Sequence, residues 1–291
     1  EGLAFHHGCG AHDLHDLMRA HEVALLQPLL DAVKDRNSVR LLGPARAEGR
    51  APTVALALNR LFPGERCLAI DTQPGERGIF YLDVHNEYNL ENLLASPETL
   101  DETLIGTALE EYRPGLRLLA GGIDSRELEG DRSADLFIAL NHLMQMFDRI
   151  VINVGTLESR HWVRALGIHA RHLLITMQPL VDQAHAVRTL GNEWRSHLGR
   201  DSQVHLVVDG MEGKVPPGLD ELAETAGVNL LGGLPMDWRH RLMAMNSGLP
   251  IQEQSPRCRY SRGLQTMVNK LESQQDVSAG ESWWQRLRSN G

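Results

Sequence analysis

The sequence predicts an α/β protein in which a mostly parallel sheet is covered by helices on both faces. Short apolar runs recur along the chain and alternate with stretches of helical length, which is the pattern of strand–helix–strand crossovers. The runs are apolar at nearly every position, as expected for strands that helices cover on both sides. With 291 residues, of which 42% are hydrophobic, the chain is long enough for one large α/β domain or two small ones.

The expected elements follow one another in a regular order. The apolar runs that we expect to be strands cover 39–42, 67–70, 116–120, 149–154, 172–177, 204–208 and 228–231. The expected helices cover 12–35, 99–112, 134–147, 181–198, 217–226, 237–246 and 260–272, and one more runs through Val54, Leu56, Leu58 and Leu61. Alternation at this spacing predicts right-handed crossovers and therefore parallel strands.

Three parts are expected along the chain. Residues 1–36 form an N-terminal segment with a linker helix, which Pro28 would kink. Residues 37–272 form the main domain. Residues 273–291 form a polar linker, SQQDVSAGES, and a short amphipathic C-terminal segment. Because the chain begins with Glu-Gly-Leu and not with Met, we expect it to be trimmed or partial, and whether a domain precedes it stays open.

Charge and cysteine content favour a cytoplasmic protein that does not bind nucleic acid. The formal net charge is −9 and no block of five or six basic residues occurs, which disfavours a nucleic-acid partner. The cysteines, Cys9, Cys67 and Cys258, are few and far apart, which indicates a reducing compartment without a disulfide framework. No apolar run reaches about 18 residues, so we expect no transmembrane helix. The first residues do not form a signal peptide.

The core is expected to be mostly aliphatic, because aromatic residues make up only 5% of the chain. Methionine usually fills gaps in a core. We therefore interpret Met144 and Met146 as core residues, and we interpret Met243 and Met245, near Trp238, in the same way.

The segment after the first expected strand has the layout of a phosphate-binding loop. A strand is followed by a glycine-containing loop and then by a helix, whose first amides point at the loop. The loop keeps Gly43, Gly49 and Thr53, but it has no lysine for the terminal phosphates. Arg46 or Arg50 can supply a cation, although arginine does not reproduce the geometry of a lysine.

Two further residues of this loop disfavour the binding of a phosphate group. Glu48 places a negative charge there, and Pro52 removes one amide donor, although proline is tolerated in a first helical turn. On the loop sequence alone, an ordinary surface loop is the simpler interpretation. Asp71, at the end of the second strand, lies where such folds bind their ligands.

Five segments in consistent order carry a family resemblance. They are DTQPGE … YLD at 71–83, NLENLL … LDETL at 89–104, GLRLLA at 115–120, FDRIVIN at 147–153, and LPMD … AMNSGLP at 234–250. This set resembles the TadZ/CpaE pilus-assembly branch of the MinD/ParA (deviant Walker A) ATPase superfamily, over about 38–272. The flagellar-placement ATPases of the same superfamily share much of the pattern.

The resemblance implies a P-loop NTPase fold that binds ATP or ADP with magnesium, and a homodimer with ATP between its subunits. It places Gly43, Arg46, Gly49, Arg50, Thr53 and Asp71 at the nucleotide. The sequence departs from the family pattern at two places that matter for ATP and magnesium. The phosphate loop has no lysine, and Asn153 stands where the family has the Walker B aspartate. A neutral amide supports magnesium poorly. We therefore expect weak or no ATP hydrolysis and assign no catalytic residue.

By this resemblance, the protein is an ATPase-like localisation and assembly adaptor for a tight-adherence (Flp) type IV pilus or a related surface machine. The expected partners are a secretion ATPase or an inner-membrane platform protein. One alternative is an active MinD-like or flagellar-placement ATPase that switches between monomer and dimer. A polysaccharide-secretion regulator is disfavoured, because none of the four tyrosines lies in the C-terminal tail.

The C-terminal segment can contact a membrane or a partner. Trp283, Trp284 and Leu287 share one side of a helix, with arginines beside them. MinD-type relatives often carry a membrane-binding helix there, so the resemblance implies peripheral contact at the inner membrane or cell pole. Docking onto the protein's own surface is the alternative.

The N-terminus is rich in residues that can bind zinc. His6, His7, Cys9, His12 and His15 lie within ten residues, but no CxxC or HExxH spacing accompanies them. A polar terminus is the simpler interpretation, and we predict no metal site.

Overall fold

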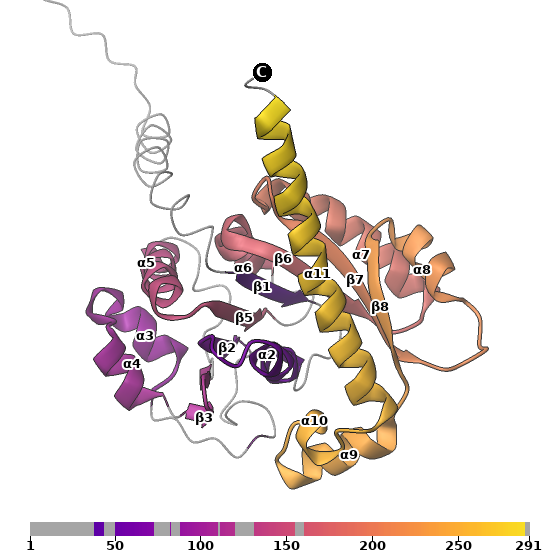
Figure 1. Cartoon of the computed structure of the whole chain (residues 1–291), viewed down its shortest axis with the longest axis horizontal. Coiled ribbons are helices and arrows are strands. Elements are labelled where there is room, and N and C mark those ends of the chain that lie inside the picture. Colours follow the sequence, from indigo (N-terminus) through magenta and orange to yellow (C-terminus); the bar gives the residue numbers. More distant parts are fainter. Residues whose placement is uncertain are drawn as a thin grey trace, which may run out of the picture. The chain divides into compact units, whose positions relative to one another are not determined.

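The computed structural model describes residues 38–43, 50–72, 82, 88–109, 111–119, 131–154 and 160–288. All of them belong to one unit, Ser38–Gly291 (Figure 1). The helix predicted over 12–35 lies outside the described residues, as does the histidine-rich segment at 6–15. The expected domain limits therefore stay predictions.

The described residues form an eight-stranded sheet with the strand order β3-β4-β2-β5-β1-β6-β7-β8. The strands are β1 (Ser38–Gly43), β2 (Cys67–Asp71), β3 (Glu111–Arg113), β4 (Leu116–Leu119), β5 (Arg149–Asn153), β6 (Ala170–Met177), β7 (Gln203–Met211) and β8 (Asn229–Pro235). Neighbouring strands are parallel except for β3, which pairs antiparallel with β4 at one edge. The predicted fold class, a mostly parallel sheet with helices around it, is confirmed.

Helices cover both faces of this sheet (Figure 1). They are α2 (Arg50–Leu61), α3 (Leu90–Ala95), α4 (Glu102–Ala108), α5 (Asp131–Met146), α6 (Arg160–Leu166), α7 (Val181–Trp194), α8 (Leu219–Ala226), α9 (Trp238–Ser247), α10 (Ile251–Gln254) and α11 (Arg259–Arg288). Short 3₁₀ turns are η1 (Pro97–Thr99), η3 (Gly167–His169) and η4 (Arg195–His197). Helices α2 and α11 pack side by side on one face, and α5, α6, α7 and α8 cover the other.

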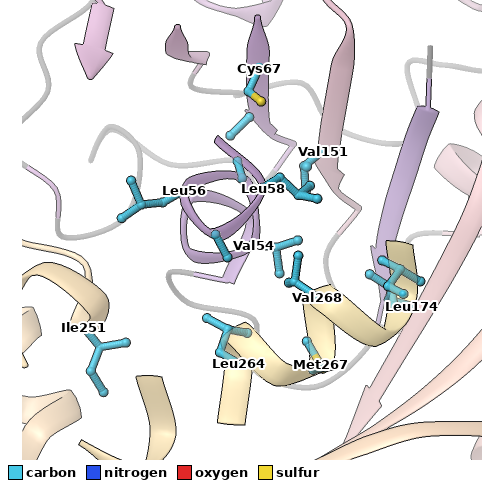
Figure 2. Packing of buried hydrophobic residues seen from close by; sticks show 14 of the residues in the cluster. Val54, Leu56, Leu58, Cys67, Val151, Leu174, Ile251, Leu264, Met267 and Val268 are labelled. Carbon is cyan, nitrogen blue, oxygen red and sulfur yellow. The ribbon is translucent and has the colours of Figure 1, made fainter. Parts of the chain in front are cut away.

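The core between the sheet and the pair α2/α11 is aliphatic, as the composition predicts. Figure 2 shows Val54, Leu56 and Leu58 of α2 beside the strands and the buried residues of α11. The buried hydrophobic positions of α11 are Tyr260, Leu264, Met267, Val268 and Leu271, a spacing of i, i+4, i+7, i+8 and i+11. This spacing forms one helical stripe. Burial of each such side chain stabilises the fold by roughly 1.5–3 kcal/mol.

A buried ion network also attaches α11 to the sheet. Arg149, the first residue of β5, donates from Nη1 to Glu272 of α11 at 2.5 Å, and its Nε donates to Glu65. Its guanidinium also lies over the Phe62 ring, 3.7 Å from the centroid. Burial alone would lower the pKa of Arg149, but the hydrogen bonds and charges of the two glutamates raise it. The arginine therefore stays charged between two carboxylates, because a buried charge needs such partners.

The expected helix over 99–112 is only partly correct. Helix α4 begins after Asp101, whose carboxylate accepts from the Leu104 amide at 2.7 Å, and it ends at Ala108. The chain then forms β3 and turns at Gly115, which has a φ of 77°. Glycine tolerates this left-handed conformation, so 111–113 can fold back and pair with β4. Helices α3, α6 and α10 were not predicted.

The helix expected over 260–272 is longer than predicted, and the polar linker expected after it is helical. Helix α11 continues through these residues and ends at Arg288. Most residues of SQQDVSAGES tolerate a helix, and only Gly280 strongly disfavours one. A helix that is already anchored by its buried stripe can extend through such a sequence, since adding a residue costs less than starting a helix.

The burial of His205 on β7, next to His172 of β6, makes stability depend on pH. Nδ1 of His172 lies 3.1 Å from Nε2 of His205. Burial, and then the charge of Lys270, lower the pKa of His205 from 6.5 to about 4. The folded protein therefore binds fewer protons than the unfolded chain between these two values. Stability is complete above pH 6.5 and decreases as the pH falls toward 4.

We expect His205→Gln to reduce this pH dependence. The free energy of unfolding of the native protein should fall by up to about 1.4 kcal/mol per pH unit from this histidine alone between pH 6.5 and 4. Denaturant titrations at pH 7.5, 6 and 5 measure the slope. An identical slope in the variant and the native protein would show that His205 does not titrate differently on folding.

Candidate functional site

The candidate site lies where β1, β2 and β5 end at the carboxyl edge of the sheet. Cα register pairs Asp71 at the end of β2 with Asn153 at the end of β5, and pairs Leu42 of β1 with the same Asn153. Strand β1 lies between β5 and β6, so the chain crosses β1 when it passes from one to the other. Open α/β sheets bind ligands outside the carboxyl ends of their strands at such a switch point.

Two buried polar side chains meet at this edge. Nδ2 of Asn153 donates to Oδ1 of Asp71 at 2.9 Å. Asp71 is 7% exposed and Asn153 is 0% exposed. Thr72 fixes the same corner, because its hydroxyl donates to the Asn153 carbonyl oxygen at 2.7 Å and its amide donates to that oxygen at 3.1 Å. The ends of β2 and β5 are therefore joined by side chains as well as by the sheet.

The hydrogen bond between Asn153 and Asp71 limits how well this site can bind a metal ion. Magnesium prefers carboxylate and water oxygens in near-octahedral geometry. Here one oxygen of Asp71 already accepts a hydrogen bond from an amide, and the pair carries one formal negative charge where two acidic residues would carry two. This donor set supports a nucleotide-bound magnesium ion poorly. Sequence reasoning singled out both residues but not the hydrogen bond between them.

The remaining predicted nucleotide residues are only partly described. Gly43 ends β1 at the same edge, and α2 begins with Arg50, so the strand and helix on either side of the loop are where the prediction places them. Arg46 and Gly49 lie outside the described residues. The side chains of Arg50 and Thr53, in the first turn of α2, are also outside the described part. Their convergence on a phosphate stays a prediction.

The C-terminal residues predicted to contact a membrane or partner are helical. Trp283, Trp284 and Leu287 lie in the last turns of α11, but their side chains are outside the described part. Among the described residues, no helix combines the length and the apolar character needed to cross a membrane. Contact with a membrane surface therefore stays a prediction.

Most of the exposed apolar side chains lie in segments that follow the carboxyl ends of strands along the chain. Within the described residues, the large hydrophobic residues that are exposed are Ile168, Leu180, Val181, Val215, Met236, Trp238, Leu242 and Met243. All except Ile168 follow the carboxyl ends of β6, β7 and β8. Gathered exposed apolar groups mark interaction surfaces more often than scattered ones do.

This arrangement corrects one interpretation of the sequence. Met144 and Met146 are buried, as predicted, but Met243 is 42% exposed and Trp238 is 60% exposed. The reason is that α9 packs on its neighbours mainly through Ala244. The sequence could have shown this, since α9 has a weak apolar stripe with charged residues between its large side chains.

Comparison with known proteins gives the fold. No family model and no curated protein matches the chain. Among solved structures, a ParA family ATPase from Chlorobium tepidum superposes with a TM-score of 0.67 at 18% identity, covering 79% of this chain and 98% of that one. MinD from Aquifex aeolicus gives a TM-score of 0.63 at 16% identity, covering 81% and 97%. The chain has the MinD/ParA fold.

A third neighbour bears on the ligand of the MinD/ParA fold. The septum site-determining protein MinD from Pyrococcus horikoshii, solved with Mg-ADP, superposes with a TM-score of 0.62 at 15% identity and covers 83% of this chain and 98% of that one. The MinD/ParA fold can therefore hold a nucleotide with magnesium. Identities of this size establish the fold, and the function of this chain has to come from its own residues.

We expect Asn153→Asp to destabilise the protein in a pH-dependent way. A second buried carboxylate against Asp71 would raise the pKa of one of the two groups. We expect a loss of about 2 kcal/mol at pH 8, which shrinks toward pH 4 as the pair is protonated. Denaturant unfolding across this pH range measures it.

Asn269→Asp is the matched control, because it makes the same substitution at an exposed position of α11. We expect it to leave the free energy of unfolding nearly unchanged. Equal stability of Asn153→Asp and the native protein at pH 8 would contradict the description of the site as buried and unable to accept a second carboxylate without a loss of stability.

Proposed function

We propose that this protein is an ATPase-like localisation and assembly adaptor of a bacterial surface machine, of the tight-adherence (Flp) type IV pilus class, with weak or no ATP hydrolysis. The observation that carries the proposal is the Asn153 amide held against the Asp71 carboxylate at the ligand edge of a MinD/ParA fold. Structural neighbours of this fold include a septum site-determining protein and a plasmid partition protein. The names of these two neighbours favour a role in positioning other molecules in the cell.

The chemistry of the edge supports weak hydrolysis. Phosphoryl transfer depends on positioning and on cations that neutralise the developing charge. The loop after β1 has no lysine, and Asn153 replaces the acidic residue expected at the magnesium. A lysine would supply positive charge itself and an acidic residue would hold the magnesium ion, so both changes weaken the neutralisation of the transition state, while the fold that would present a nucleotide is retained. Nucleotide binding without rapid turnover fits this combination.

The ordered motifs at 71–250 favour the TadZ/CpaE branch, and hence a pilus secretion ATPase or an inner-membrane platform protein as the partner. Trp283, Trp284 and Leu287 at the end of α11 would supply peripheral contact with the membrane or with this partner. The alternative is an active ATPase that switches between monomer and dimer, which Asp71, retained at the end of β2, favours.

We also propose a homodimer that forms through the carboxyl edge. The exposed apolar residues after β6, β7 and β8 give this edge a surface that water solvates poorly. The largest of them is Trp238, and tryptophan is enriched among the residues that contribute most to interface affinity. A dimer with a weakened nucleotide site would then depend more on this packing than on ATP.

Steady-state hydrolysis of ATP tests the adaptor proposal. We expect phosphate release with magnesium to match a blank without protein, and Asp71→Ala to leave the rate unchanged because there is little activity to lose. Asp182→Ala, an exposed acidic residue in the first turn of α7, is the matched control. Magnesium-dependent turnover that disappears in Asp71→Ala and survives in Asp182→Ala would replace the adaptor with the switching ATPase.

Sedimentation velocity tests the dimer. We expect the native chain to be dimeric at micromolar concentration and Trp238→Ser to raise the dissociation constant at least tenfold, about 1.4 kcal/mol. Ile168→Ser is the matched control, because Ile168 is 50% exposed but precedes β6 at the opposite edge. A native monomer, or equal weakening by both substitutions, would exclude an interface at the carboxyl edge.

A further inference from the structure

We propose that Asp237, His240 and Cys258 form a zinc site beyond the end of β8. Asp237 is the residue before α9, His240 lies in the first turn of α9, and Cys258 immediately precedes α11. One ligand atom from each residue lies within 4.8 Å of the ligand atoms of the other two. Nδ1 of His240 is 2.6 Å from Oδ1 of Asp237. Three potential ligands from two helices therefore converge on one point.

The ligand types favour zinc over the harder cations. Imidazole nitrogen, carboxylate oxygen and thiolate sulfur all bind Zn²⁺, at about 2.0–2.3 Å, and a water can complete a tetrahedron. Magnesium and calcium prefer sets made of oxygen alone. In a tetrahedral site the ligand atoms lie about 3.3–3.8 Å apart, from those bond lengths. Binding would then require His240 and Asp237 to separate by less than about 1 Å.

The surroundings of the three residues suit a metal with anionic ligands. Sγ of Cys258 accepts from the Ser261 amide at 3.3 Å and lies 3.2 Å from the Ser261 hydroxyl, which fixes the sulfur at the start of α11. Arg241, one of the two arginines that flank His240 on α9, is directed elsewhere, with Nη1 3.3 Å from Oδ2 of Asp209. The His240 side chain is 39% exposed, against 14% for Asp237, so an ion can enter from the histidine side.

The site would connect the starts of α9 and α11, which already meet where the Arg241 guanidinium lies 5.4 Å from the centroid of the Tyr260 ring. A metal shared by His240 and Cys258 would tie the first turn of α9 to the start of α11. Trp238 lies between two of the ligands in sequence, so its position on the carboxyl edge would become more rigid. The zinc proposal does not depend on the proposed function, because it is measured by metal binding and not by ATP chemistry or oligomeric state.

Cobalt titration of the full chain with reduced thiols tests the proposal, because a thiolate ligand gives Co²⁺ a charge-transfer absorption that histidine and aspartate alone do not give. We expect this absorption to saturate at one equivalent and to be displaced by Zn²⁺. Cys258→Ser should abolish it. Cys67→Ser, a change at a fully buried cysteine of β2, and Cys9→Ser, a change in the histidine-rich N-terminal segment, should both retain it.

A second measurement protects the test against misfolding of the cysteine variant. His240→Gln alters a partly exposed side chain, and we expect it to weaken Zn²⁺ affinity at least tenfold in competition with a chromophoric chelator while circular dichroism stays unchanged. Zn²⁺ should also raise the melting temperature of the native protein but not that of Cys258→Ser. Absence of the thiolate absorption in the native protein, or its survival in Cys258→Ser, would overturn the proposal.

Discussion

The hydrogen bond from the Asn153 amide to the Asp71 carboxylate determines what the carboxyl edge of this protein can do. It joins the ends of β2 and β5, next to the end of β1, in a place that is almost closed to water. Open α/β sheets bind their ligands at this edge. We propose that an edge with one carboxylate, and that one engaged by an amide, supports ATP hydrolysis poorly.

The rest of the structure holds this edge in place and leaves it accessible. Helices α2 and α11 bury an aliphatic face of the sheet, and Arg149 links the first residue of β5 to α11 through Glu272. At the other end of the strands, the segments after β6, β7 and β8 expose apolar side chains. A stable scaffold with an apolar surface at its ligand edge suits a protein that acts by binding partners.

The sequence predicted the parallel sheet and most of the helices, because buried strands are apolar at nearly every position and their ends are polar. The resemblance singled out Asp71 and Asn153, but the hydrogen bond between them depends on strand order, which periodicity does not encode. The exposure of Trp238 was missed although the weak apolar stripe of α9 could have shown it, and the continuation of α11 to Arg288 was missed because a helix that is already anchored can extend through a polar sequence. Cys258 joins Asp237 and His240 only in three dimensions, so spacing rules for metal motifs could not find that cluster.

The effect of magnesium on ATP affinity shows whether the Asp71–Asn153 pair can support a cation. Isothermal titration of the full chain with ATP, once with Mg²⁺ and once with a chelator, measures how much the edge contributes to holding a cation. We predict that ATP binds weakly with Mg²⁺ and with the chelator, and that the two affinities differ by less than tenfold, or about 1.4 kcal/mol. Tight binding that appears only with Mg²⁺ would contradict it, because the Asp71–Asn153 pair would then support the cation after all.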